Sequence, residues 1–352
     1  MANVINDDMI LFMKSFFGSL LITLFVSLQA HSLEKIDITG EVALNASLWY
    51  LPTGEQGNST FDLSTFFLGV SADLHNSNYM QIVFEADEAE MKLREAYVDL
   101  ASAFSGMRVL RMGLLPQPWL KSYYEIWDYR FLDRTSWGLL EKWNYQRFSD
   151  YGVSYMSELA QGRGEWAVTI VNGKEEKNRG PHKEFSFFVR WNDFTNWSLS
   201  ANYSRGSYDK YDDGDDLKER AQFLAVYSLE RIKAGIELLY TQDSNFAFAD
   251  NAMAEGVETT LLPKGLLTGL GASLFAVVET GPKAETFLRL DYLDAAQGEG
   301  GKTLLTTMLG LGYRLTEDLR LAAMIDYTVY GDDFAPGARD TSKLVIAAQV
   351  LF

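Results

Sequence analysis

The feature that most restricts the fold of this chain is an alternation of apolar and other side chains that recurs from one segment to the next. Between Ile36 and Tyr50 the even positions hold Ile, Ile, Gly, Val, Leu, Ala, Leu and Tyr, whereas Asp, Thr, Glu, Asn and Ser occupy most odd positions. Successive side chains of a β-strand point to opposite faces of a sheet. The segment is therefore predicted to be a strand with one apolar face.

Sixteen segments carry this pattern, and the connections between them have two different lengths. Connections after even-numbered segments are short, such as DFT at 193 and TE at 316, whereas most connections after odd-numbered segments are longer and polar. Short turns at one end and long loops at the other are typical of an up-and-down barrel. The predicted strands are 36–51, 62–74, 78–88, 91–100, 107–115, 150–158, 165–172, 183–192, 196–205, 219–229, 231–242, 265–279, 284–293, 303–315, 318–330 and 342–352.

The polar face of these strands decides between a soluble barrel and a membrane barrel. A soluble barrel would turn its apolar face inward, but the opposite face here carries too many charges, on too many strands, for an eight-stranded cup. We therefore predict an all-β fold in which residues 33–352 form one transmembrane antiparallel up-and-down barrel of about 16 strands. Its apolar side chains would face lipid, its polar side chains would face water, and closure would remove unpaired strand edges.

Residues 1–32 do not follow the alternation and have the features of a targeting segment. The stretch 13–32 reads MKSFFGSLLITLFVSLQAHS, in which one lysine precedes an apolar run and small residues stand at the positions that a signal peptidase reads. We expect a signal peptide over 1–32, cut after Ser32 or nearby. Met13 is the expected initiator, because Asp7 and Asp8 are unusual before such a signal. A membrane anchor is the alternative, although the apolar run is short for a span.

The composition excludes several kinds of site and partner. The chain has no cysteine, which excludes disulfides, thiolate metal sites and thiol nucleophiles. Its net charge of -17 makes nucleic acid a poor partner. The histidines His31, His75 and His182 lie in the signal region, a short turn and a loop, so a histidine-dependent active site is not expected. We predict neither an enzyme nor a cofactor, although a mechanism that uses carboxylates alone stays open.

Two adjoining stretches resemble a known porin family. Arg94–Leu100 reads REAYVDL, and Met107–Trp119 reads MRVLRMGLLPQPW. Together they resemble the paired strands before the third loop in porins of the phosphate-selective porin O and P type. The resemblance implies a barrel in the bacterial outer membrane that is usually trimeric and passes small anions. The alternating last strand, which ends on Phe352, likewise resembles the C-terminal signature of bacterial outer-membrane proteins.

The longest connection, residues 116–149, is unusual for a loop because it is dense in Trp, Tyr and Phe and carries charges of both signs. Long ordered loops are more often functional than not. We predict that this segment folds into the barrel, narrows the pore and sets an electric field across it. A folded extracellular cap or a subunit contact is the alternative.

Charged residues of this loop and of the inward strand faces are the candidate pore-lining residues. Strand phase turns Arg111 inward, next to the loop. Basic members would attract anions and acidic members cations, and the wall leans acidic, so anion selectivity would have to come from a local constriction. The candidates are Arg111, Lys121, Arg130, Arg134, Asp128, Asp133, Glu95, Asp99, Arg190, Arg289 and Arg320.

A cluster of aspartates is a weak candidate for calcium. Tyr208–Leu217 reads YDKYDDGDDL, and carboxylate oxygens are ligands that calcium prefers. The spacing does not match the standard calcium loop, so a solvated acidic loop is the favoured interpretation. The aspartates are Asp209, Asp212, Asp213, Asp215 and Asp216.

Three functions of different classes fit these features. The leading hypothesis is an outer-membrane porin that allows passive diffusion of ions and small hydrophilic solutes, among them anions such as phosphate. The second is a structural or adhesive barrel with a plugged lumen, and the third, less favoured, is an outer-membrane hydrolase. The expected partners are outer-membrane lipid and lipopolysaccharide, small hydrophilic solutes and further copies of the chain in a homotrimer, and not nucleic acid.

Overall fold

The computed structural model describes residues 33–50, 56–86, 91–101, 108–133, 136–143, 145–173, 183–207, 217–243, 267–297, 302–331 and 340–352. Every predicted segment forms a strand, and most strand ends lie within a few residues of the predicted ones. The largest difference is in β2, which begins at Gln56 rather than at residue 62. The hydrophobic period alone therefore located the strands.

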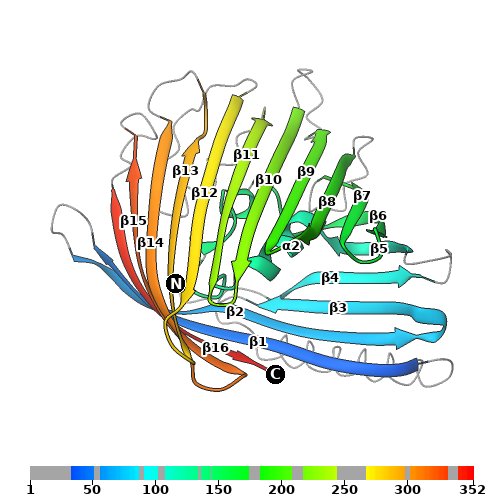
Figure 1. Cartoon of the computed structure of the whole chain (residues 1–352), viewed down its shortest axis with the longest axis horizontal. Coiled ribbons are helices and arrows are strands. Elements are labelled where there is room, and N and C mark those ends of the chain that lie inside the picture. Colours follow the sequence, from blue (N-terminus) through cyan, green and yellow to red (C-terminus); the bar gives the residue numbers. More distant parts are fainter. Residues whose placement is uncertain are drawn as a thin grey trace, which may run out of the picture.

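The strands follow one another around the barrel in chain order (Figure 1). Their bounds are β1 Leu33–Tyr50, β2 Gln56–Leu74, β3 Asn78–Ala86, β4 Met91–Leu100, β5 Arg108–Pro116, β6 Ser149–Leu159, β7 Gly164–Val171, β8 Glu184–Phe194, β9 Trp197–Ser207, β10 Leu217–Leu229, β11 Ile232–Asp243, β12 Leu267–Glu279, β13 Ala284–Asp294, β14 Thr303–Arg314, β15 Leu319–Tyr330 and β16 Thr341–Leu351. The helices are η1 His75–Ser77, α2 Pro118–Ile126 and α3 Leu139–Lys142.

Pairing between β1 and β16 closes the barrel, and all neighbouring strands are antiparallel. Glu41 lies opposite Leu351, and just beyond this pair Gly40 and Phe352 exchange backbone hydrogen bonds of 2.7 and 3.0 Å. A Cβ atom at Gly40 would overlap the Phe352 ring, so only glycine lets the ring lie across the strand there. Closure leaves no free edge among these strands. The predicted fold class is confirmed.

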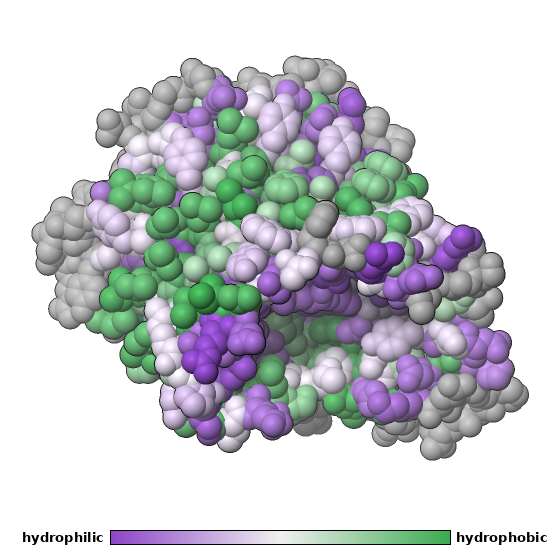
Figure 2. All heavy atoms as spheres, in the orientation of Figure 1, coloured by the Kyte–Doolittle hydropathy of each residue, from purple (hydrophilic) through white to green (hydrophobic). Residues whose placement is uncertain are grey.

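The barrel is apolar outside, and the buried charges lie on its inward strand faces. On β13, Leu288, Leu290 and Tyr292 are exposed to 42, 36 and 42%, whereas Arg289 and Asp291 between them have no exposed surface. Figure 2 shows hydrophobic residues gathered over the strands β10–β14. An outward apolar band around a polar interior is the arrangement of a transmembrane barrel and the reverse of a soluble one.

The segment 116–149, called the internal loop below, contributes the helices α2 and α3. In Figure 1, α2 lies within the curve of the barrel, behind β9 and β10. Helix α2 begins after Gln117 and has Pro118 in its first turn. Proline is tolerated there because a backbone N–H at this position would have no partner within the helix. Among the described residues, no helix is both long and apolar enough to cross a membrane.

Some of the sequence-based predictions fall outside the described residues. These are the signal peptide over 1–32 with its start at Met13, the pore candidate Arg134, and the histidines His31 and His182. The calcium candidates Asp209, Asp212, Asp213, Asp215 and Asp216 lie outside them too. All of these stay predictions.

Candidate functional site

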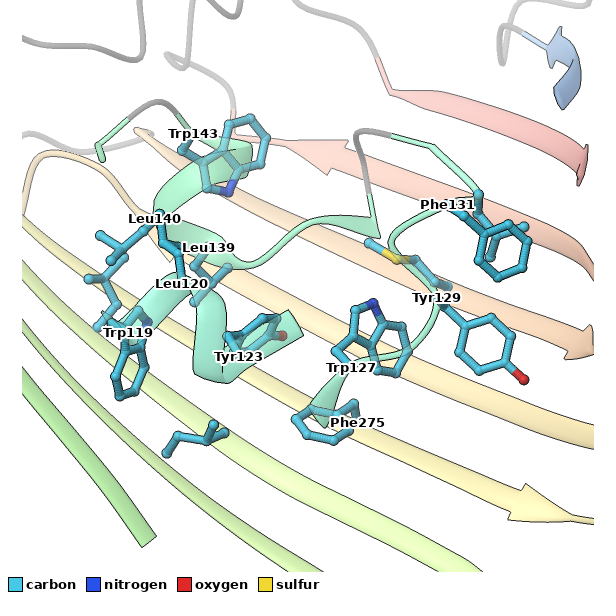
Figure 3. Close-up of a cluster of buried hydrophobic side chains, with 14 of the residues drawn as sticks. Trp119, Leu120, Tyr123, Trp127, Tyr129, Phe131, Leu139, Leu140, Trp143 and Phe275 are labelled. Atoms are coloured by element: carbon cyan, nitrogen blue, oxygen red, sulfur yellow. The ribbon is translucent and has the colours of Figure 1, made fainter. Parts of the chain in front are cut away.

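The internal loop contributes several fully buried side chains to the interior of the barrel. Trp127, Tyr129, Leu132, Leu139 and Leu140 each have no exposed surface. They form one apolar cluster with inward-facing residues of β12 to β16 (Figure 3). The loop is thus held inside the barrel by a hydrophobic core of its own.

Two phenylalanines of the wall form the surface on which this core packs. The ring of Trp127 meets Phe275 of β12 edge to face, with centroids 5.3 Å apart (Figure 3). It also meets Phe287 of β13, with centroids 6.0 Å apart. The ring of Tyr129 lies 3.8 Å from that of Phe287. Each such pair contributes about 0.5–1.5 kcal/mol beyond the area that it buries.

Glycines of the wall make room for these rings. A Cβ atom at Gly235 would overlap the ring of Phe275, and one at Gly310 would overlap the ring of Phe287. At Gly312 a Cβ atom would lie 2.5 Å from the Tyr129 hydroxyl oxygen. Glycine within a strand often marks a place where another group approaches the backbone closely. Gly310 and Gly312 of β14 therefore leave space for the aromatic rings at the place where the loop packs against the wall.

A buried charge network joins the loop to β13. Arg289 donates from Nε to Asp291 Oδ1 at 2.7 Å and from Nη1 to the carbonyl oxygen of Ser136 at 2.9 Å. Lys142 of α3 donates to Asp291 Oδ2 at 3.3 Å, and burial lowers the pKa of Lys142 while Asp291 opposes that shift. Because wall and loop each supply members, the loss of one would leave a buried charge uncompensated, at a cost of about 3–5 kcal/mol.

Two further cations of the wall bind the middle of the loop. Arg320 of β15 donates from Nη1 to Asp128 Oδ2 at 2.9 Å and from Nη2 to Glu285 Oε1 at 2.6 Å. Lys343 of β16 pairs with Asp133. The wall therefore holds successive parts of the loop at successive strands.

The end of α2 is held in the same way from β8 and β11. Arg190 donates to Glu125 Oε2 at 2.8 Å and to Ser122 Oγ at 3.1 Å. Lys233 donates to the carbonyl oxygen of Ile126 at 3.1 Å, where a cation also suits the negative end of the helix dipole. We call strands β8 to β16, which carry these contacts, the docked wall.

The side of the barrel between the loop and β1–β4 is only partly filled. Asn45 of β1 donates to the carbonyl oxygen of Leu132 at 3.1 Å and Ser64 of β2 donates to that of Phe131 at 2.9 Å, but the rest of this side is hollow. A cavity of about 360 Å³ is lined by the loop and by residues of these strands. A second cavity of about 650 Å³ lies at the short-turn end, against residues 315–318. Asp128, Gln349 and Leu351 line both, so the two cavities adjoin. Figure 2 shows a hollow with hydrophilic residues beside it. We call strands β1–β4, which line the 360 Å³ cavity, the open wall.

Two arginines face the 360 Å³ cavity, and each has a carboxylate partner. Arg94 donates to Glu85 Oε1 at 2.8 Å, and Arg130 donates to Glu141 Oε1 at 3.3 Å. The guanidinium carbon of Arg94 lies 3.7 Å from the ring centroid of Phe148, a cation–π contact. Burial raises the pKa of Glu141 to about 8 and lowers the pKa of Arg130.

The neighbouring strands β4 and β5 carry a third arginine–carboxylate pair, and β4 also carries a carboxylate with an unbonded oxygen atom. Arg111 binds Asp99 through two hydrogen bonds of 2.7 and 2.8 Å and stacks 3.9 Å from the ring centroid of Tyr97. Tyr97 donates its hydroxyl to Gln81 at 2.6 Å. Glu95 is 7% exposed, and among the described residues its Oε2 finds no hydrogen-bond donor.

The predicted pore-lining residues thus fall into distinct places, and their lining of a conducting pore stays a prediction. Arg190, Arg289, Arg320, Asp128 and Asp133 take part in contacts between wall and loop; Arg111 and Asp99 bind each other; Arg130 and Glu95 face the 360 Å³ cavity; Lys121 lies half-buried on α2.

Strict alternation missed Arg94. Val83 pairs with Glu95 and Phe84 pairs with Leu93, so Arg94 is the extra residue of a β-bulge, and it is buried like its neighbour Glu95. A signal for the bulge exists in the sequence, because an arginine turned toward lipid near the middle of a strand would cost about 2–4 kcal/mol.

Two buried cations of β10 were also missed. Lys218 lies 2.6 Å and Arg220 lies 3.9 Å from Glu184 of β8, and both cations face the lumen. Both faces of the predicted segment 219–229 carry apolar residues, so period two could not tell the faces apart. Pairing with β9 and β11 decides the orientation instead.

No family model and no curated protein matches the sequence. Solved structures match it along most of its length. An anion-selective porin from Comamonas acidovorans is 12% identical, with a TM-score of 0.67 over 90% of this chain and 99% of that one. OmpF of Salmonella typhi in complex with daunomycin is 14% identical, with a TM-score of 0.65 over 90% and 98%.

A loop-deletion mutant of OmpT, an outer membrane protein of Vibrio cholerae, is 14% identical, with a TM-score of 0.64 over 90% of this chain and 99% of that one. At such identities the likeness establishes the fold. This chain therefore has the fold of a porin-like barrel, as its sequence predicts.

Proposed function

We propose that the protein is a passive channel of the bacterial outer membrane for ions and small hydrophilic solutes. The path runs between the internal loop and the open wall. The observation that carries this proposal is the pair of adjoining cavities, of about 360 and 650 Å³, which share Asp128, Gln349 and Leu351. Polar and charged side chains at such a constriction replace part of a solute's hydration and so set which solutes pass.

The loop would act as a fixed constriction. The docked wall holds it by aromatic packing around Trp127 and by ion pairs at Arg289, Arg320 and Lys343. Interiors packed in this way deform little. The width of the path would then depend on the side chains that face it, and Arg94, Arg130 and Glu95 are foremost among them.

Ion preference is a separate part of the proposal. The family resemblance predicts anions such as phosphate, and one solved neighbour is described as anion-selective. In this chain Arg94 and Arg130 each hold a carboxylate partner, which weakens their attraction for anions. The sign of the reversal potential under a salt gradient tests this part.

The proposal also covers the oligomeric state of the protein and the question of catalysis. One OmpT structure is described as a trimer form, and we propose a homotrimer surrounded by outer-membrane lipid and lipopolysaccharide. No chemical step is proposed. Among the described residues His75 is the sole histidine, and it lies exposed in the short turn η1. Nor do the described residues include a group of three or more His, Asp or Glu side chains placed to hold a metal.

A structural barrel with a plugged lumen is the second candidate, and one observation favours it. The loop fills part of the interior with side chains that have no exposed surface, including Trp127 and Leu139. The two candidates differ in whether the gap along the open wall conducts. Purified barrel in a planar bilayer should give steady ohmic steps, and a folded but silent barrel would reject the channel.

Cysteine labelling locates the path, because the native chain has no cysteine. Single variants Gln81→Cys and Gln349→Cys place a thiol in the proposed path, whereas Ser273→Cys places one under the loop on the docked wall, where Ser273 is fully buried. A charged methanethiosulfonate reagent should lower the current through the first two variants and leave the third unchanged. Equal effects at all three positions would contradict the proposed path.

A further inference from the structure

Glu95 is a carboxylate in the lumen, and passive diffusion by itself does not explain why one of its buried oxygen atoms has no hydrogen-bond donor. It lines the 360 Å³ cavity and is 7% exposed, yet its Oε2 meets no hydrogen-bond donor among the described residues. A buried carboxylate oxygen without a donor is costly, because the hydration that it gave up is not replaced. Such an atom at a cavity wall is suited to a ligand that brings its own positive charge.

The β-bulge in β4 gives the cavity this carboxylate together with a neighbouring cation. Because Arg94 is the extra residue, both Arg94 and Glu95 turn inward, whereas a regular strand would present only one of them. Arg94 is already bound to Glu85 at 2.8 Å. The bulge therefore leaves Glu95 as the charge that is available to a solute.

The remaining charges of the cavity are largely paired. Arg130 binds Glu141, and Asp128 binds Arg320. Glu41, the third carboxylate of the lining, accepts a hydrogen bond of 3.0 Å from the neutral Gln349.

Arg94 acts on the charge of Glu95, and so do two cations outside the lining. These are Lys121 and Arg111, and Arg111 is bound through both hydrogen bonds to Asp99. Among the described residues, Glu95 and Glu41 are thus the lining groups whose charge no ion pair cancels.

Aromatic rings supply the rest of the cavity wall. Phe67, Tyr124, Phe131 and Phe148 line it. Faces of these rings already accept cations, because the guanidinium carbon of Arg94 lies 4.5 Å from the centroid of Phe67 and that of Arg130 lies 4.5 Å from the centroid of Tyr124. A cavity of about 360 Å³ whose wall combines aromatic rings with charged and polar side chains has the size of a small-molecule site.

We propose that this cavity is a binding site for small organic ammonium ions, in which Glu95 and Glu41 hold the ammonium group and the aromatic rings hold its apolar part. The proposal deepens the channel function and rests on it for its biological role, since such ions would pause at this site on their way through. Water-filled paths use weak sites of this kind to select solutes without trapping them.

Three probes of one shape and different charge test the site. Phenethylammonium, 2-phenylethanol and phenylacetate each carry a phenyl ring on a two-carbon chain, with positive, neutral and negative charge. Each is added to wild-type barrels that conduct in a planar bilayer, and the concentration that halves the current is measured. Phenethylammonium should block at a concentration about tenfold lower than phenylacetate, which corresponds to one well-placed charge interaction. Equal blocking by all three would overturn the proposal.

Matched variants assign the effect to the carboxylates. Glu95→Gln should raise the half-blocking concentration of phenethylammonium about tenfold, and Glu41→Gln should raise it less. Glu165→Gln is the control, because Glu165 is a carboxylate outside the cavity, and Arg190 keeps its second partner Glu125. An unchanged value in Glu95→Gln, or an equal change in the control, would overturn the proposal.

Equilibrium binding separates this proposal from the channel. Phenethylammonium is titrated into detergent-solubilised wild type and Glu95→Gln, and the difference between them removes partitioning into detergent. A silent barrel that binds the probe through Glu95 rejects the channel and keeps the site. A conducting barrel without this difference keeps the channel and rejects the site.

Discussion

The docked wall and the open wall of the barrel meet the same internal loop in opposite ways. Against β8 to β16 the loop buries Trp127, Tyr129 and Leu139 completely, and its backbone is held by Arg289 and Lys233. Against β1–β4 the loop is held by two hydrogen bonds, from Asn45 and Ser64, and otherwise leaves a cavity lined by charges such as Arg94. One loop can therefore be fixed inside the barrel and also line the pore. Its packed side, the dry side, determines the position of the loop, and its side at the cavity, the wet side, determines which solutes pass.

The strongest way to break the contrast is to remove the ring at the centre of the dry side. Trp127→Ala should cost about 3–5 kcal/mol, because removal of a fully buried indole leaves a cavity and three lost aromatic contacts. The released loop should move, so single-channel conductance should become larger and noisier than in the wild type. Denaturant unfolding in detergent measures the first effect, and bilayer recording measures the second. A quiet, unchanged channel would show that the loop is held elsewhere.

A substitution of the wall tests the same contact from the other side. Gly310→Ala would place a Cβ atom into the Phe287 ring and 2.6 Å from the carbonyl oxygen of Ala323. Phe287 and the Tyr129 ring that packs against it must shift, at a cost of about 1–3 kcal/mol. Unfolding in detergent measures this loss. Gly281→Ala is the control, since the nearest atom to its Cβ lies at an ordinary 3.7 Å. Equal losses of stability in both variants would show that Gly310 does not make room for the Phe287 ring.

The pH dependence of stability sharpens the boundary between the two sides, where Glu141 of α3 meets Arg130. Burial raises the pKa of Glu141 from an ordinary 4.5 to about 8. The folded state then keeps this proton to higher pH than the unfolded state, so the free energy of unfolding falls as pH rises from about 4.5 to about 8.

Relative to Glu141→Gln, the wild type should lose on the order of 1–2 kcal/mol across this window, because the ion pair with Arg130 offsets part of the burial cost. Unfolding of both proteins at pH 5 and pH 8 gives the difference. A wild type that gains stability against the variant over this interval would show that the ion pair dominates.

The smallest effect on stability is expected on the wet side. Phe67→Ala removes a half-buried ring of the open wall, and we expect a loss of about 1 kcal/mol or less. Because Phe67 lines the 360 Å³ cavity, the single-channel conductance should nevertheless rise. Paired with Trp127→Ala, it compares the same kind of deletion on the two sides, and a large stability loss here would erase the distinction between them.

Local pattern predicted the barrel well and the loop contacts poorly. The period of two located every strand and the inward side of residues such as Arg289 and Asp291. It misplaced Arg94, because one extra residue in β4 reverses the phase of the positions that precede Glu95 in this strand. It also could not show that Arg111 binds Asp99, since the register between β4 and β5 brings them together.

The amino-acid sequence by itself determined that this protein is a closed barrel, apolar outside and polar inside. Alternation is a property of neighbouring residues, and in a membrane only closure pairs every strand. The tertiary structure alone decided where the loop docks, which charges pair and which side stays open. Those outcomes depend on Phe275, Phe287 and the glycines beside them, which lie more than a hundred residues beyond Trp127 in the chain and meet it through the curvature of the barrel.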